Sequence, residues 1–133
     1  QNYTIDSNVG DAVGVSASFT GDNFGNGKSL YALTNTSATA NTTAVDFGAS
    51  SSLGGQAYLH CTAHSSANIS VKIQSSADNS SFADVSGFSF TAITGTTSER
   101  IATTNTVNRY VRIVITVTSG SATFSVGYAH NLK

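Results

Sequence analysis

The feature that most constrains this chain is a two-residue alternation of apolar and polar side chains. Apolar residues occupy every second position in the segments 57–63, 69–73, 111–117 and 122–128. Successive side chains of a β-strand point to opposite faces, so this spacing gives each segment one apolar face. No stretch of eleven or more residues shows the 3.6-residue periodicity of an amphipathic helix. We therefore expect strands and little helix.

The strand-like segments are short and are separated by turns rich in Gly, Ser and Asn. This pattern predicts an all-β fold, an antiparallel β-sandwich of jelly-roll or Ig-like type with about ten short strands in two packed sheets. The "TSGS" at 118–121 predicts a hairpin between 111–117 and 122–128. Asp78 and Asn79 predict a turn, anchored by Phe82 and Val85. The length of 133 residues predicts a single domain, 1–133.

Composition narrows the classes of partner. The formal net charge is −1 and 10% of the residues are charged, so the basic surplus typical of nucleic-acid binding is missing. Ser and Thr make up 39 of the 133 residues, which suits strands whose outer faces meet water or another protein. No apolar run approaches the roughly 20 residues of a membrane span, and no leader peptide is recognisable. Because the chain starts with Gln1, we expect it to be processed or part of a longer product.

The residues typical of metal sites and thiol chemistry are few and far apart. Cys61 is the single cysteine, so an internal disulfide is impossible, and it shares the apolar face of its strand. We expect a buried thiol that acts as a small apolar side chain. In a strand, His60 and His64 would lie about 13 Å apart, too far to share a zinc ion. We therefore predict no metal site.

Catalytic patterns are missing as well. The seven acidic residues are scattered, mostly at strand ends and turns, where carboxylates cap backbone N–H groups. No local motif brings two of them together as glycoside hydrolysis requires. The segment "GDNFGNGK" is rich in glycine but lacks the glycine-lysine-serine/threonine ending of a phosphate-binding loop. The chain is therefore predicted not to be an enzyme, with no catalytic residues and no cofactor.

The segment "NRYVR" at 108–112 places two of the six basic residues at the start of a strand. Arg112 falls on the face opposite Val111 and Ile113, so it should project outward, toward Glu99 or toward a carboxylate of a neighbouring subunit. Intramolecular and intersubunit ion pairs both remain open. The predicted interface residues are Arg109, Tyr110, Arg112, Glu99, Lys72 and Tyr58.

Four stretches carry a resemblance to a known group of proteins: "VGDAVGVSASF", "LYALT…TAVDFGASSSLGGQAYLHCTA", "VKIQSSADNSSFADV" and "SERIATTNTVNRYVRIVI…ATFSVGYA". Together they resemble the C-terminal region of tailed-bacteriophage virion proteins known as major tail or tail-tube proteins. The resemblance covers most of the chain and is best from about 55 to 129. Those proteins carry a comparable stretch before this region, which is missing here.

The resemblance implies a virion structural protein that self-associates in many copies and contacts other virion proteins, with "NRYVR" completing a core strand. A tail-tube protein or tail decoration comes first, and a capsid decoration (cement) protein is the alternative. A different class also fits the residues: a lectin-like carbohydrate-binding module that uses Tyr58, His60 and loop asparagines to bind glycans.

Overall fold

The computed structural model describes residues 4–6, 14–16 and 27–131. Nine β-strands cover most of these residues, and no helix occurs among them. The strands are β1 (Thr4–Asp6), β2 (Gly14–Ser16), β3 (Gly27–Thr36), β4 (Ala40–Asn41), β5 (Val45–Asp46), β6 (Gly55–Ser76), β7 (Ala83–Ser89), β8 (Thr97–Thr103) and β9 (Tyr110–His130). The prediction of an all-β fold with little helix is confirmed.

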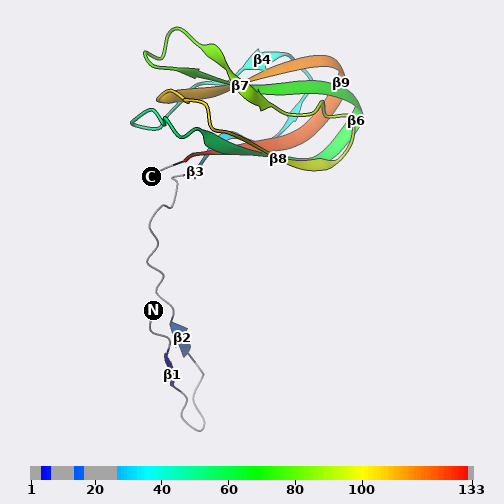
Figure 1. The fold of residues 1–133 in the computed structure, drawn as a ribbon. Helices are drawn as coiled ribbons and strands as arrows, with labels where there is room; N and C mark the ends of the chain where they lie inside the picture. The colour runs from blue at the N-terminus through cyan, green and yellow to red at the C-terminus, as the bar shows by residue number, and fades with distance from the viewer. Residues whose placement is uncertain (1–3, 7–13, 17–26, 132–133) are drawn as a thin grey trace.

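The strands form two antiparallel sheets of unequal size. β1 and β2 pair with each other, and the other seven strands form one sheet around β6 and β9 (Figure 1). The predicted pair of packed sheets built from about ten short strands is not confirmed, because a single hydrogen-bonded sheet joins all seven strands. Its two central strands are also long, with 22 residues in β6 and 21 in β9.

The seven-stranded sheet consists of four long segments of the chain that lie side by side. β6 and β9 pair almost throughout, from Gly55 opposite His130 to Ser76 opposite Tyr110. The segment 27–46 follows the other side of β9 as β3, β4 and β5, and the segment 83–103 follows the other side of β6 as β7 and β8. Across the sheet, the order is therefore the segment 27–46, then β9, then β6, and then the segment 83–103.

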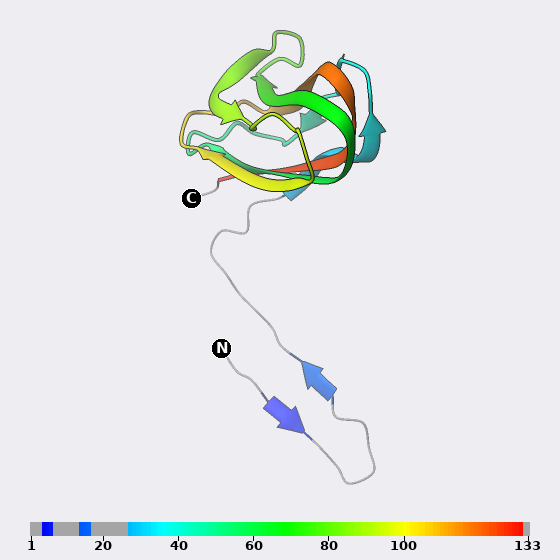
Figure 2. The ribbon, with the colours of Figure 1, turned by 90° about the vertical axis from the view of Figure 1, so that its right-hand side faces the viewer.

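β6 and β9 bend together near their middles, as the curved ribbons show (Figures 1 and 2). The register shifts between Cys61 and Ile69, and Ser66 and Gly120 both adopt positive φ there. We call the part of the sheet formed by 55–61, 122–130, β3 and β8 the β8 half. The part formed by 69–76, 110–117, β4, β5 and β7 is the β7 half.

The predicted hairpin at 118–121 is wrong, because β9 continues through this segment without reversing its direction. Its inward-facing residues are odd-numbered up to Ile115 and even-numbered from Ala122 onward. An irregularity in the strand changes which side chains face inward without reversing the chain direction. Gly120 makes this possible, since a Cβ atom there would overlap the carbonyl oxygens of Ser65 and Ser66.

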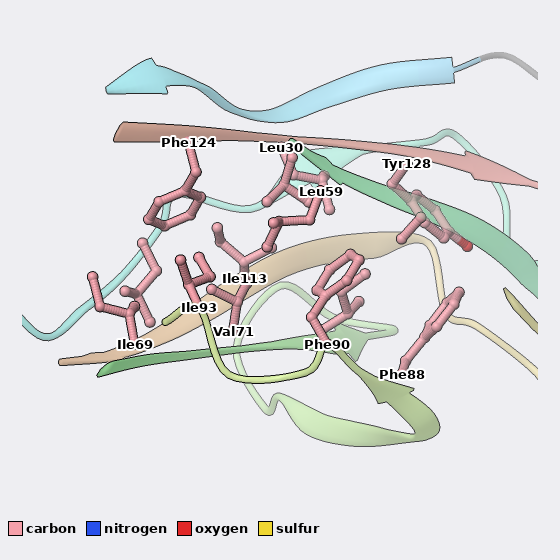
Figure 3. Close-up of a cluster of buried hydrophobic side chains, with 14 of the residues drawn as sticks. Leu30, Leu59, Ile69, Val71, Phe88, Phe90, Ile93, Ile113, Phe124 and Tyr128 are labelled. Atoms are coloured by element: carbon pink, nitrogen blue, oxygen red, sulfur yellow. The ribbon is translucent and has the colours of Figure 1, made fainter. Parts of the chain in front are cut away.

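Side chains from both halves meet in one apolar core (Figure 3). Leu59, Phe124 and Tyr128 come from the β8 half, while Val71 and Ile113 come from the β7 half, and all are at most 2% exposed. Fully burying one large apolar side chain contributes about 1.5–3 kcal/mol, so this core is the main source of stability. The alternation predicted from the sequence is confirmed along both central strands.

The core belongs to residues 27–131, so a single domain spanning 1–133 stays a prediction. The Asp78–Asn79 turn is confirmed between β6 and β7. The Asp78 carboxylate accepts hydrogen bonds from the backbone N–H groups of Ser80 and Ser81, and Asn79 has a φ of 59°. Most of the glycine-rich segment 20–28 lies outside the described residues.

Candidate interaction surfaces

Arg109 and Tyr110 make contacts that join β5 to the start of β9. Arg109 Nε and Nη2 donate to the two carboxylate oxygens of Asp46 at 2.7 and 2.6 Å, and its guanidinium carbon lies 5.0 Å from the centre of the Tyr110 ring. This pairing, with a further bond from the Gly48 N–H, lowers the pKa of Asp46 to about 2. The charge of Arg109 is therefore balanced within the chain.

Arg112 projects outward from the buried stripe of Val111 and Ile113, as predicted. Of its two predicted partners, Glu99 is wrong, and a carboxylate of a neighbouring subunit stays a prediction. Arg112 Nε and Nη2 instead donate to Gln74 Oε1 at 3.0 and 2.8 Å, because Gln74 is the residue directly opposite on β6. The guanidinium carbon lies 4.0 Å from the centre of the Phe82 ring. A neutral amide and an aromatic face thus hold this arginine.

Lys72 extends this contact across the outer face of the β7 half. Its Nζ lies 2.7 Å from Asp84 Oδ2, and Gln74 Nε2 donates to Asp84 Oδ1, also at 2.7 Å. These bonds, the one from Lys72 first, lower the pKa of Asp84. Arg112, Gln74, Asp84 and Lys72 therefore form one polar network that crosses β9, β6 and β7. Such exposed pairs contribute little stability but organise the surface.

Glu99 lies on β8 and fixes the loop that precedes it. Its two carboxylate oxygens accept hydrogen bonds from the backbone N–H of Thr91 at 2.9 Å and from the Thr91 hydroxyl at 3.1 Å. Among the described residues, no cationic side chain lies within 4.0 Å of the Glu99 carboxylate. Glu99 therefore has a local structural role.

Tyr58 is the predicted interface residue with the greatest freedom to meet a partner, since half of it is exposed. Its hydroxyl donates to Gln56 Oε1 at 3.2 Å. Arg100 Nε and Nη2 donate to the same oxygen at 3.1 and 2.7 Å. We call Gln56, Tyr58 and Arg100 the Gln56 cluster. Within the described part of the chain, no carboxylate oxygen lies within 4.0 Å of the Arg100 guanidinium.

The Gln56 cluster stands between two shallow hollows. One, of about 380 Å³, is lined by Tyr58 and by residues of β3 and β9, among them Lys28, Ser29, Ser125 and Gly127. The other, of about 360 Å³, is lined by Gln56 and Arg100 together with Asn105 and Asn131. A half-exposed aromatic ring and an arginine without a carboxylate partner therefore form a ridge with space on both sides.

Sequence reasoning missed Gln56 and Arg100. Gln56 alternates with the apolar positions that begin at Ala57, so its outward direction was readable from the pattern, whereas Arg100 lies between Glu99 and Ile101 and gave no such signal. Their meeting depends on the pairing of β8 with β6, which places Arg100 directly opposite Tyr58. The two segments are separated by about 40 residues, and no local signal specifies this register.

The cysteine and histidine residues considered for thiol or metal chemistry make contacts within the fold. Cys61 is buried at 2% exposure, as expected, and its thiol lies 3.4 Å from the Ala63 carbonyl oxygen. The His60 Nδ1 atom shares a hydrogen bond with the Ser98 hydroxyl. Across the described ranges, no three His, Cys, Asp or Glu residues are grouped so that they could hold a metal ion.

The same ranges contain no helix that is both long and apolar enough to cross a lipid bilayer. Comparison with known proteins adds no relative, since no family model and no curated protein matches the chain.

Proposed function

We propose that this protein is a structural component of a tailed-bacteriophage virion that assembles in many copies. The tail tube or the tail surface is the first location, and capsid decoration is the second. The sequence motifs described above support this assignment. The proposal includes self-association and contact with other virion proteins, and it assigns no catalytic step and no cofactor.

The structural observation that best supports assembly is the open edge of the sheet at β3. This strand is ten residues long and pairs with β9 on one side, while no described strand pairs with its other side. Leu33, near its middle, is 57% exposed. Open edge strands offer unpaired backbone N–H and C=O groups to another chain, and soluble proteins normally protect them. A second copy or a neighbouring virion protein would cover this edge.

The proposal also treats the bent sheet as a two-layer β-sandwich, of jelly-roll or Ig-like type. Support comes from the shared core, because inward-facing residues of the β8 half and the β7 half lie in one cluster. A compact two-layer unit with polar outer faces suits repeated packing, since each copy keeps its core intact while its faces and edges contact neighbours.

Assembly is tested by measuring the size of the purified chain as its concentration rises. We expect sedimentation velocity to show larger species with increasing concentration, and negative-stain images to show rings, tubes or decorated phage particles. A chain that stays monomeric at the highest soluble concentration and binds no tail or capsid preparation would refute the virion role.

The lectin-like alternative is favoured by one observation, the half-exposed Tyr58 ring beside a shallow hollow. Aromatic rings in such positions stack on sugar rings. A glycan array tests this function, with Tyr58→Ala as the variant that should lose binding. Glycan binding by a strictly monomeric chain would favour the lectin over the virion protein.

A further inference from the structure

Arg100 carries a charge that the described part of its own chain leaves unbalanced. Two of its five N–H donors bind Gln56 Oε1, which fixes the plane of the guanidinium group and leaves the others available. Because Gln56 is neutral, it orients the arginine without compensating its charge. An arginine held in this way is suited to accept a carboxylate from outside, since little further ordering is required.

Asp78 presents the complementary group. It lies in the turn 77–81, in which every residue is exposed. Its Oδ1 atom accepts hydrogen bonds from the Ser76 hydroxyl and from the backbone N–H groups of Ser80 and Ser81, at 2.7–2.9 Å. No described residue donates to Oδ2. The Asp78 carboxylate is therefore rigidly placed at the tip of a turn, with one oxygen open.

Asp78 is better suited to this role than the other acidic residues whose side chains are described. Asp46 is paired with Arg109, and Asp84 is paired with Lys72. Both oxygens of Glu99 bind Thr91. The bonds from Ser81, Ser76 and Ser80 also lower the pKa of Asp78 to about 2, so it is ionised at neutral pH.

Arg100 and Asp78 lie on opposite sides of the body. β8, which carries Arg100, runs along the bottom in both views, and the turn between β6 and β7 lies at the top (Figures 1 and 2). The two charges therefore cannot meet within one molecule. A contact between different patches of two copies is head-to-tail, and it repeats into a ring or a filament.

We propose that the Asp78 turn of one copy docks on the Gln56 cluster of the next, where its carboxylate pairs with Arg100 and the turn occupies the hollow that Gln56 and Arg100 line. Small residues, among them Ser86, Gly87 and Ala102, also line this hollow, and they leave room for a turn whose other residues are Ala, Asn and Ser. This inference rests on the proposed assembly and specifies one contact within it.

Charge variants test the contact. Asp78→Asn keeps the oxygen that accepts the turn's hydrogen bonds and removes the charge, and Arg100→Glu reverses the other partner. We expect each to weaken self-association measured by sedimentation at least about tenfold, a typical effect of losing a close charge pair. Lys72→Gln is the control, since it removes a positive charge on the β7 half without placing a carboxylate beside Asp84, and it should assemble like the wild type.

A mixing experiment makes the test specific. Arg100→Glu and Asp78→Lys should each assemble more weakly alone than when the two are mixed, because each junction of the mixture joins opposite charges. Circular dichroism of each variant verifies folding. Wild-type assembly that persists in both single variants overturns this contact and leaves the virion proposal standing, whereas assembly recovered in the mixture supports the contact. A monomeric wild type overturns both. Loss of acidic-glycan binding in Arg100→Glu with unchanged assembly assigns the cluster to sugars and also overturns the contact.

Discussion

The β7 half and the β8 half share the same two central strands but differ in their polar chemistry. On the β7 half, Arg112, Lys72 and Asp84 are tied into one network through Gln74. On the β8 half, Arg100 has no carboxylate partner among the described residues, and Tyr58 is half exposed. The same two strands therefore carry two different outer faces. On the β7 half these charged side chains are bonded to one another through Gln74, and on the β8 half Arg100 lacks a carboxylate partner among the described residues.

The interiors of the two halves also differ in how completely their polar atoms are hydrogen-bonded. Two buried polar atoms lack hydrogen-bond partners among the described residues, Tyr128 Oη and His130 Nε2, and both belong to the β8 half. Leaving such atoms unpaired costs stability. The interior of the β7 half is the better satisfied of the two. In the proposed contact this half contributes the Asp78 turn at its end, and the β8 half contributes the cluster that receives it.

The largest predicted effect concerns Gly120, which joins the two halves. In Gly120→Ala, the new Cβ atom would overlap the Ser65 and Ser66 carbonyl oxygens, and the residue would also keep a φ of 64°. We expect the free energy of unfolding to fall by about 3 kcal/mol or more, because steric overlap adds to the strain of the left-handed conformation. Urea denaturation measures this loss.

Gly87→Ala is the matched control for that experiment. Gly87 also has a positive φ, 77°, but a Cβ atom there would meet no atom within 4 Å. It should cost only about 1–2 kcal/mol, the strain of the backbone conformation alone. Equal losses in the two variants would show that the close approach at the bend does not matter, and the division into two halves would lose its structural basis.

Much of the fold was predictable because burial follows the two-residue pattern. The inward positions of β6 and β9, such as Leu59, Ile73, Ile113 and Phe124, are the ones that the alternation indicated. The hairpin predicted at "TSGS" was wrong because a turn and an irregular bend in a strand use the same small residues. Only the partner strand distinguishes them, and β6 lies more than 40 residues away in the sequence.

The candidate site was less predictable for the same reason. Tyr58 was identified from its own position, as an outward-facing aromatic residue. The neighbours that define its chemistry, Gln56 and Arg100, required knowledge of which strands pair and in which register. Arg112 is a second example: its outward direction was predicted correctly, but its partner within the chain is Gln74 and not Glu99. Single-strand periodicity predicts faces, whereas side-chain contacts depend on long-range pairing.

A smaller effect, of opposite sign, is expected from Tyr128→Phe. The variant removes a buried hydroxyl that has no partner and keeps the ring, which packs edge-on against Phe47 and Phe88 at 5.1 and 5.8 Å. We expect the free energy of unfolding to rise by about 1 kcal/mol. Tyr31→Phe is the control, because its hydroxyl lies 2.6 Å from Thr36 Oγ1, and its loss should destabilise by about 1 kcal/mol. Similar losses in both variants would contradict the assignment.

The smallest effect is a pH dependence from His130. The residue is 7% exposed, and its ring centre lies 4.9 Å from that of Phe47 and 5.3 Å from that of Tyr128. Burial lowers the pKa of His130 below its ordinary value of 6.5, and a hydrogen bond with the Asn108 backbone opposes this only in part. Below pH 6.5 the unfolded chain therefore takes up a proton that the folded chain resists.

The sign of the effect follows from this difference in proton binding. Stability from neutral His130 is fully present above pH 6.5 and declines as the pH falls toward the lowered pKa of the folded state. His130→Phe should flatten the decline in the free energy of unfolding between neutral pH and pH 5, measured by urea denaturation at each pH. The exposed positions His60 and His64 supply control variants that should keep it. An unchanged slope in His130→Phe would mean that the β8 half tolerates a charge in its interior, so that its difference from the β7 half would be confined to the surface.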